Sequence, residues 1–344
     1  MAYAGKAVVR DVSFQLAAGD IGCLLGPSGC GKTSLLRAIA GFEPVTGGSI
    51  RLGGVEVASP DGLMPPEQRR VGMVFQDFAL YPHLTVEKNV AFGLRGWSAA
   101  ERRERVASLL ELVGLQGEGR RYPHQLSGGQ QQRVALIRAM APRPNILLMD
   151  EPFSSMDVDL REQLAREVRE ILKRDGITAI LVTHDQMEAF AMADVIGVLG
   201  EGHLHQWAPG YALYHQPADR FVADFIGQGV MLKGQVLADG SIQTALGVIR
   251  DEENLQRGSG EVEFLLRPDD IVHDDASPLK LEVVSRAFRG AAYLYTLALE
   301  DGSRVLCLVQ SHHDHAIGEK IGVRLVVDHL VVMSNGKQGN TLHD

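Results

Sequence analysis

Cysteine is scarce in this chain. The 344 residues include only Cys23, Cys30 and Cys307, and their spacing matches neither a set of metal ligands nor an even-numbered disulfide framework. The sequence therefore excludes a fold that depends on disulfides, and the three thiols fit a reducing compartment. Cys30 lies in a glycine-rich loop, where we interpret its thiol as a small filler.

Long apolar runs and an excess of positive charge are also absent. No stretch approaches the roughly 18 consecutive apolar residues that a membrane-spanning helix needs, so we expect any passage across a bilayer to belong to another chain. We also expect no signal peptide at the start of the chain. The formal net charge of −9 argues against nucleic acid as the main partner, because phosphate backbones bind to basic surfaces.

Composition and apolar patterning predict two domains. With 45% hydrophobic and 22% charged residues, the chain is typical of a globular protein, and its length exceeds what one core usually fills. An amphipathic stripe predicts a helix over 160–172, and alternation over 49–57 predicts a pair of antiparallel strands. Buried strands of a parallel sheet covered by helices are expected at 21–25, 71–75, 146–149 and 177–182.

The pattern changes near residue 229. From there on, turn signals such as Asp239-Gly240 and Asp301-Gly302 separate short strand-like runs. Candidate strands are 230–237, 242–249, 261–267, 279–287, 292–299, 304–309 and 321–333. We therefore predict an α/β domain over 1–228 and a compact all-β barrel or sandwich over 229–344.

A glycine-rich loop gives the clearest indication of chemistry. Residues 26–33 read GPSGCGKT and lie between an apolar run and a helical pattern, which is the context that a phosphate-binding loop requires. The glycines let several N–H groups converge on one anion, and the helix start adds its positive end. Lys32 is expected to reach the β- and γ-phosphates, and Thr33 to offer its hydroxyl to Mg²⁺. The residues expected to hold the nucleotide here are Gly26, Pro27, Ser28, Gly29, Cys30, Gly31, Lys32, Thr33 and Ser34.

Two carboxylates follow another strand candidate. Asp150 and Glu151 come directly after the apolar run 146–149, at what would be the carboxyl edge of a parallel sheet. Asp150 is expected to hold Mg²⁺ through water, and Glu151 to polarise an attacking water molecule. Alone, the pair could be an acidic loop after a core strand, but the phosphate loop favours the catalytic interpretation.

A second anion-binding cap lies at residues 126–130, which read LSGGQ and lead into a helical pattern. A hydroxyl, a bare glycine backbone and a helix start suit a phosphate group, although the pentapeptide alone could be a plain N-cap. One phosphate loop has no evident need for a second clamp on the γ-phosphate. We therefore infer a head-to-tail dimer in which one copy closes the nucleotide site of the other through Ser127, Gly128, Gly129 and Gln130.

Together these motifs resemble those of ATP-binding cassette (ABC) ATPase subunits, over nearly the whole chain. The resemblance implies a P-loop NTPase domain with an antiparallel β-subdomain and a helical subdomain at about 80–140. It also implies ATP hydrolysis, with ATP and Mg²⁺ as cofactors. The run LRPDD at 266–270 resembles the motif of the OB-like TOBE domain that follows importer ATPases.

The resemblance assigns roles to four further residues. Gln76 resembles the Q-loop glutamine, which senses Mg²⁺ and the membrane partner, and is implied in both metal binding and catalysis. His184 resembles the switch histidine, which holds the γ-phosphate and the attacking water. Asp157 ends the run SSMD, which resembles the D-loop at the dimer seam, although Ser-Met replaces the commoner Ala-Leu. Tyr3 resembles the aromatic residue that stacks on adenine, and the chain ahead of it is shorter than is usual in the family.

The resemblance also implies partners. Residues 80–86, which read LYPHLTV, are similar to importer ATPases of the polyamine, sugar, sulfate and iron groups. This surface is expected to receive a short helix from a membrane permease, although Tyr81, His83 and Leu84 could simply be packing residues. We expect a homodimer on the cytoplasmic face of the inner membrane, peripheral to it, with a periplasmic solute-binding protein as an indirect partner and no nucleic acid.

The expected cargo is ferric iron, and this expectation rests on sequence similarity alone. Segments 213–219, 225–229 and 339–342 resemble ferric-iron importer ATPases. The alternatives are another cargo, such as a polyamine, sulfate, a sugar or a phosphonate, and a soluble ABC ATPase without a transport role.

The run His312-His313-Asp314-His315 is the other candidate for metal chemistry. Histidine and aspartate are metal ligands, but a site needs side chains that converge, and a four-residue run rarely provides this alone. We interpret the run as an exposed polar loop.

Overall fold

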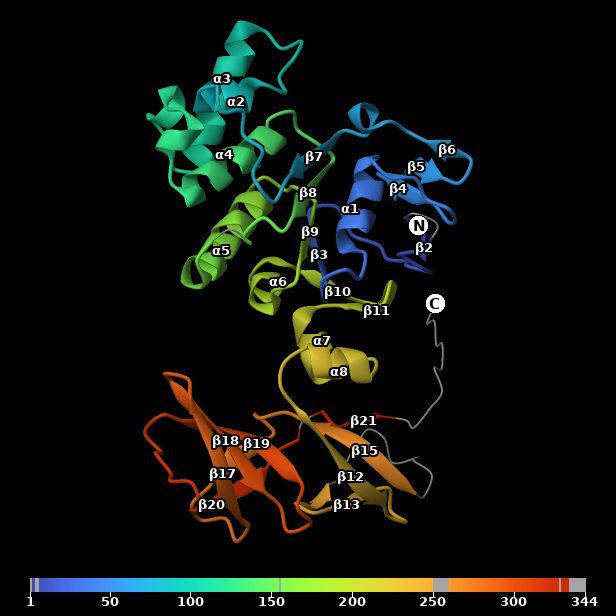
Figure 1. Ribbon diagram of the computed structural model, residues 1–344, viewed down its shortest axis with the longest axis vertical. Coiled ribbons are helices and arrows are strands. Elements are labelled where there is room, and N and C mark those ends of the chain that lie inside the picture. The colour runs from blue at the N-terminus through green and yellow to red at the C-terminus, as the bar shows by residue number, and fades with distance from the viewer. Residues whose placement is uncertain (1, 4–5, 155, 250–259, 328, 334–344) are drawn as a thin grey trace. The chain divides into compact units, whose positions relative to one another are not determined.

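A computed structural model describes residues 2–3, 6–154, 156–249, 260–327 and 329–333 (Figure 1). The side chains at 2, 3, 6, 7, 158 and 159 lie outside that description as well. The chain packs as two units, Met1–Gly210 and Tyr211–Asp344. The boundary expected at 228–229 falls just before the first strand of the second unit, which begins at Val230, and as a domain boundary it stays a prediction.

A six-stranded sheet forms the centre of the first unit, in the order β11-β10-β3-β9-β8-β7. All neighbours are parallel except the edge pair β10–β11. The strands are β3 (Ile21–Leu25), β7 (Val71–Val74), β8 (Ile146–Asp150), β9 (Ala179–Thr183), β10 (Val195–Gly200) and β11 (His203–Ala208). The four predicted strands are confirmed. β3 and β9 are buried along their whole length, as strands covered on both faces must be.

Helices pack on this sheet. α1 (Lys32–Ala40) contacts β8 and β9, and α6 (Gln186–Met192) contacts β3 and β9. α5 (Val158–Arg174) packs against α6 and confirms the amphipathic helix predicted over 160–172. Its buried stripe consists of Leu164, Ala165, Val168, Ile171 and Leu172.

The remainder of the first unit consists of small elements. The strand pair predicted over 49–57 is confirmed as part of an antiparallel sheet of β4 (Ile50–Leu52), β5 (Val55–Ser59) and β6 (Gly62–Leu63). β1 (Ala2–Tyr3) pairs with β2 (Lys6–Ala7). Three helices lie between β7 and β8: α2 (Val86–Ala91), α3 (Ala99–Leu112) and α4 (Gly128–Met140). Short 3₁₀ turns are η1 (Pro66–Gln68), η2 (Glu118–Arg120) and η3 (Pro123–Gln125).

The second unit is mainly β-structure around one apolar core. Helices α7 (Gly210–His215) and α8 (Arg220–Phe225) precede two five-stranded antiparallel sheets, ordered β14-β13-β12-β15-β21 and β16-β20-β17-β18-β19. The strands are β12 (Val230–Val236), β13 (Ile242–Thr244), β14 (Gly247–Ile249), β15 (Glu261–Leu266), β16 (Ile271–His273), β17 (Lys280–Phe288), β18 (Ala292–Ala298), β19 (Arg304–Gln310), β20 (Lys320–Leu325) and β21 (Val331–Met333). Phe264 and Tyr295 are fully buried in this core.

Two predicted strands of this unit are each divided in the structure. The run 242–249 folds as a β13–β14 hairpin, because Gly247 has a φ of 113° and Oγ1 of Thr244 donates to the Gly247 carbonyl oxygen at 2.8 Å. The run 321–333 separates into β20 and β21, which belong to different sheets. The structure also contains β16, which the sequence pattern did not indicate. In the part of the chain described here, every helix is too short or too polar to cross a membrane.

Candidate active site

The carboxyl ends of three neighbouring strands bring the predicted catalytic residues together. Leu25 at the end of β3 is in register with Thr183 of β9, and Asp150 of β8 with Val182 of β9. The phosphate loop therefore starts at the same sheet edge at which Asp150 ends its strand. This is the edge at which open parallel sheets bind their ligands.

Glycines shape the loop between β3 and α1. Gly31 caps α1 with a φ of 103°, and Gly29 has a φ of 83°, a region that side chains rarely allow. A Cβ atom on Gly26 would lie 2.2 Å from the Leu199 carbonyl oxygen, and one on Gly31 would lie 2.6 Å from Cγ2 of Val9. The loop can adopt this shape only with glycine at these positions.

Lys32 folds back into the loop that it follows. Its side chain is buried, and Nζ donates to the carbonyl oxygens of Gly26 at 2.8 Å and Pro27 at 2.9 Å, with Sγ of Cys30 at 3.9 Å. Hydrogen bonds from an ammonium group to phosphate oxygens are stronger than those to neutral carbonyls. The loop thus holds a cation that an anionic group could draw away from these partners.

Thr33 and Asp150 form the part of the site suited to a metal ion. Oγ1 of Thr33 donates to Oδ1 of Asp150 at 3.1 Å. Burial raises the pKa of the Asp150 carboxyl, against the opposing effects of the Thr33 hydrogen bond and of Arg37, and nearby Glu151 raises it further. A cation would offset this cost of burying the carboxylate. A hydroxyl and a carboxylate are oxygen ligands of the kind that Mg²⁺ prefers, so the donor set fits this ion.

Glu151 is held in a left-handed backbone conformation, with a φ of 43°. Its N–H donates to the Val182 carbonyl oxygen at 3.0 Å, and its own carbonyl oxygen accepts from Oγ of Ser154 at 3.0 Å. Oε1 of Glu151 lies 3.4 Å from Nδ1 of His184. Backbone strain of this kind, about 1–3 kcal/mol, persists only where the surroundings fix it. The structure therefore pairs the proposed base with the proposed switch histidine.

Residues behind His184 were missed by the sequence reasoning. Oγ1 of Thr183 donates to Oε2 of Glu188 at 2.6 Å and accepts from the Asp185 N–H at 3.0 Å. Oδ1 of Asp185 caps α6 by accepting from the N–H groups of Met187 and Glu188. Burial raises the pKa of Glu188. The signal that could have revealed this support was the spacing D-x-x-E immediately after a buried strand.

Arg161 supports the neighbouring loop. Its Nε donates to the Met156 carbonyl oxygen at 2.9 Å and Nη2 to the Ser154 carbonyl oxygen at 3.2 Å. Nη1 lies 3.7 Å from Oδ2 of Asp185. One guanidinium group thus links the predicted D-loop to the cap behind His184. Asp157 itself is exposed and begins α5 without a side-chain cap.

Gln76 lies on an exposed turn after β7. Among the described residues it makes no hydrogen bond to Asp150 or Glu151. The turn continues through Phe78 and Ala79, with φ values of 59° and 46°. The Arg138 guanidinium in α4 donates to both of their carbonyl oxygens, at 2.8 and 2.6 Å. Helix α4, which begins within the LSGGQ run, is therefore hydrogen-bonded to the loop that follows Gln76.

The LSGGQ run forms a capping box at the start of α4. Oγ of Ser127 accepts from the Gln130 N–H at 3.3 Å, and Oε1 of Gln130 accepts from the Ser127 N–H at 3.0 Å. The first-turn N–H groups at Gly128 and Gly129 have no partner within a helix. In the described part of the chain, no hydrogen bond joins this run to the phosphate loop. The side chain of Tyr3, the predicted adenine-stacking residue, lies outside the described residues, as does the tail at 339–342.

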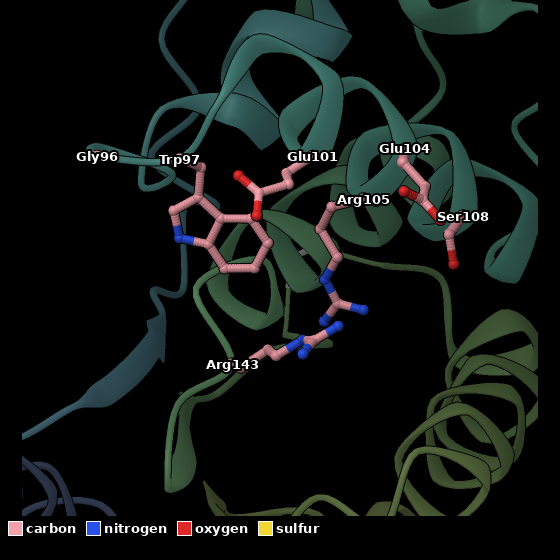
Figure 2. Close-up of a pocket in the computed structure, with 7 residues that line it drawn as sticks. All are labelled: Gly96, Trp97, Glu101, Glu104, Arg105, Ser108 and Arg143. Atoms are coloured by element: carbon pink, nitrogen blue, oxygen red, sulfur yellow. The ribbon is translucent and has the colours of Figure 1, made fainter.

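A separate pocket of about 470 Å³ lies in the helical part of this unit (Figure 2). Its lining includes Trp97, Arg143 and three charged residues of α3, which are Glu101, Glu104 and Arg105. The Arg143 guanidinium lies 5.7 Å from the Trp97 ring centroid. None of its lining residues belongs to the predicted site. The pocket is therefore not the place where we expect nucleotide.

The phosphate loop, the acidic strand end and the histidine on one edge of a parallel sheet define a P-loop ATPase of the ATP-binding cassette class. Residues 9–154 match the ABC transporter family and residues 264–333 the TOBE domain. The chain belongs to the ABC transporter family, as an ATP-binding subunit of the importer type with a C-terminal TOBE domain.

Relatives named for ferric-iron import and relatives named for polyamine transport are both similar to this chain over almost its whole length. The Fe(3+) ions import ATP-binding protein FbpC of Streptomyces avermitilis is 42% identical, covering 96% of this chain and 95% of that protein. The spermidine/putrescine import ATP-binding protein PotA of Rubrobacter xylanophilus is also 42% identical, covering 96% and 90%. The Escherichia coli putrescine transport protein PotG is 38% identical, covering 96% and 92%.

Proposed function

We propose that the protein hydrolyses MgATP as a head-to-tail homodimer and thereby drives import of ferric iron through a separate permease. The observation that carries the hydrolytic part is the pair of neighbouring contacts Thr33–Asp150 and Glu151–His184. They support the proposal because a hydroxyl–carboxylate pair suited to a metal ion neighbours the carboxylate that we propose as the base and the histidine beside it. The phosphate loop with Lys32 at its centre lies at the same sheet edge.

Hydrolysis in such a site rests on positioning and charge neutralisation. Thr33 and Asp150 would hold Mg²⁺, which when bound neutralises charge on the β- and γ-phosphate oxygens. Glu151 orients the attacking water and takes up its proton as the water oxygen bonds to the γ-phosphorus. His184 donates a hydrogen bond to a γ-phosphate oxygen, and Lys32 offsets the charge that develops on the departing ADP. Gln76 would supply a further oxygen ligand to the Mg²⁺ ion.

The dimer is inferred from the incomplete site of one copy. Ser127 and the N–H groups of Gly128 and Gly129 form a cap suited to a phosphate group, yet they make no hydrogen bond to the phosphate loop of the same chain. A second copy arranged head to tail would bring this cap to the γ-phosphate. Asp157 would then lie at the seam between the two copies.

The permease is proposed to dock on the region after Gln76. Tyr81 lies against Phe92, with ring centroids 4.4 Å apart, and Phe92 is exposed. Asn89 is fully buried and bonds the backbone of Tyr81 and Leu84, which fixes the shape of this surface. Membership of an importer family supports a position at the cytoplasmic face of the membrane, with a periplasmic solute-binding protein delivering the cargo.

The proposal that ferric iron is the cargo rests on sequence resemblance to ferric-iron importer ATPases, and no residue described here is argued to bind the cargo. One segment that resembles ferric-iron importers, 213–219, folds against the TOBE motif: the Arg267 guanidinium donates to the carbonyl oxygen of Tyr214 at 3.2 Å, and also to that of Ala223, beyond the segment, at 3.1 Å. The hydroxyl of Tyr214 donates to Asp269 at 2.8 Å. These contacts serve packing. A polyamine is the second candidate, because the polyamine-importer relative is as similar as the ferric-iron one.

Uptake decides between the cargoes. Labelled Fe³⁺ and labelled putrescine would be supplied separately to a strain that lacks the protein and to the same strain complemented with the wild type or with Glu151→Gln. The proposal expects Fe³⁺ uptake to return only with the wild type. Restored putrescine uptake without restored Fe³⁺ uptake would replace the cargo and leave the ATPase proposal intact, whereas activity of Glu151→Gln would overturn the mechanism.

A further inference from the structure

Three histidines converge in the second unit. In the sequence they lie well after the residues that we propose for ATP hydrolysis. His273 ends β16, and His313 and His315 lie in the loop between β19 and β20. One ring nitrogen from each lies within 4.8 Å of the other two. The sequence reasoning weighed only the run from His312 to His315 and lacked the third, distant side chain.

Two ring nitrogens of these histidines are buried and poorly satisfied. Nε2 of His273 and Nε2 of His315 are buried and make no hydrogen bond. The His273 side chain is only 9% exposed, and its Nε2 lies 3.2 Å from Oδ1 of Asp275, whose side chain is exposed. Buried polar atoms are nearly always satisfied, so Nε2 of His315, which has no hydrogen-bond partner among the described residues, calls for a ligand.

The tautomer of His315 is set by a carboxylate. Nδ1 of His315 lies 2.8 Å from Oε1 of Glu319. Oε2 of Glu319 also accepts from the Ala316 N–H at 2.9 Å, and a carboxylate that accepts on both oxygens leaves Nδ1 of His315 to carry the hydrogen. Nε2 of a neutral His315 is then a bare lone pair. A carboxylate behind an imidazole is the usual support of a metal-bound histidine.

The loop that carries two of the histidines is anchored to the core. The hydroxyl of Tyr295, a fully buried residue, donates to the His313 carbonyl oxygen at 2.8 Å and accepts from the His315 N–H at 2.9 Å. Asp314, which alternates with the histidines, is instead engaged by Arg286. His312 is exposed. The two histidines that face His273 are therefore held there by backbone contacts that do not involve their rings.

We propose that His273, His313 and His315 form a binding site for a divalent transition-metal ion, with Zn²⁺ and Fe²⁺ as the fitting class. Three neutral imidazoles suit these ions, whereas Mg²⁺ and Ca²⁺ require oxygen ligands. A water molecule or the nearby Asp275 carboxylate completes the coordination. Zn–N bonds of about 2.0–2.1 Å keep ligand nitrogens within about 4 Å of one another, and the three histidine nitrogens already lie within 4.8 Å of one another. The site stands independently of the proposed cargo.

The test uses the untagged, full-length, nucleotide-free protein after treatment with a chelator. Zn²⁺ is titrated by calorimetry, and Co²⁺ is used as a coloured substitute whose visible spectrum reports coordination by nitrogen. The proposal expects one ion per chain and no competition from millimolar Mg²⁺. His273→Ala and His315→Ala should each weaken binding by at least about 100-fold, and Glu319→Gln by about 10–100-fold, because it acts through His315.

His312→Ala is the matched control, since it removes an exposed histidine from the same loop that packs against His313, with ring centroids 4.3 Å apart, but is not one of the three converging residues. It should leave the affinity unchanged. Basal ATP hydrolysis should be unchanged in all four variants and shows that they are folded. The proposal is overturned if the wild type binds no Zn²⁺ at micromolar concentrations, or if His312→Ala weakens binding as much as His273→Ala does.

Discussion

Nδ1 of His184 lies 3.4 Å from Oε1 of Glu151, and these residues follow adjacent parallel strands. An ionised carboxylate only accepts hydrogen bonds, so His184 can donate to Glu151 through Nδ1. A second donation, through Nε2 to a γ-phosphate oxygen, requires the imidazolium form, in which both ring nitrogens carry hydrogen. The Thr183–Glu188 bond and the Asp185 cap hold the backbone on either side of His184. The position of the backbone that carries the histidine is therefore set by the fold.

Glu151→Gln should abolish turnover while keeping nucleotide binding. The amide cannot accept a proton from water, so kcat should fall by about 10²–10⁴-fold, as expected for loss of a general base. Phosphate release and binding of a fluorescent ATP analogue measure the two effects. Glu162→Gln, which removes an exposed carboxylate paired with Arg166, is the control. Unchanged turnover in Glu151→Gln would remove Glu151 from its assigned role.

Ser127→Ala should impair hydrolysis beyond its effect on stability. Loss of the cap costs about 1 kcal/mol and, on our proposal, also removes a contact to the γ-phosphate in the partner's site. Ser98→Ala is the matched control, because Ser98 forms the same capping box with Glu101 at the start of α3. Both variants should lose similar thermal stability, and only Ser127→Ala should lose most ATPase activity. Equal activity in the two variants would argue against the dimer.

Arg138→Ala should release the turn after Gln76. Hydrogen bonds from a charged donor contribute about 1.5–3 kcal/mol, and two end here on the carbonyl oxygens of Phe78 and Ala79. We expect a lower melting temperature and loss of the stimulation of ATP hydrolysis by the permease, with nucleotide affinity retained. Permease-stimulated and basal rates are compared in proteoliposomes. Full stimulation in the variant would show that the link carries no coupling.

Acid stability should depend on Asp194. Burial opposes ionisation of this carboxyl, but hydrogen bonds from Lys173, the Ile21 N–H and Arg169 outweigh it and lower the pKa below the ordinary 3.8. A carboxyl whose pKa is lower in the folded state stabilises the fold above its unfolded pKa, and this contribution is lost as the pH falls through the folded value. The melting temperature of the wild type should therefore fall more steeply below about pH 4 than that of Asp194→Asn. Parallel curves for the two proteins would contradict this assignment.

Much of the site could be predicted because each motif follows a buried strand. Lys32, Asp150 and His184 lie beyond apolar runs of four or five residues, and parallel strands end at a common edge. The Arg138 contacts could not be predicted, because they depend on left-handed backbone at Phe78 and Ala79, about sixty positions away. Propensity does not place non-glycine residues in that region.

The histidine cluster shows the same limit in the second unit. His273 ends a strand of three residues, too short to give a periodic signal, and its register with Val323 of β20 brings it to the loop at 311–315. The adjacent histidines were visible in the sequence, but their partner was not. Convergence of distant side chains is a property of strand pairing rather than of local pattern.

The Arg161 side chain has a further consequence for how two assembled copies would work. Because it touches both the loop that would face a second copy and the cap behind His184, displacement of that loop would reach the histidine through a single rigid group. ATP bound at one site would then change the affinity of the other site for ATP. The rate of ATP hydrolysis would therefore rise sigmoidally with ATP concentration. Coupling of this kind is reciprocal for binding, so each bound nucleotide would raise the affinity of the other site by the same factor.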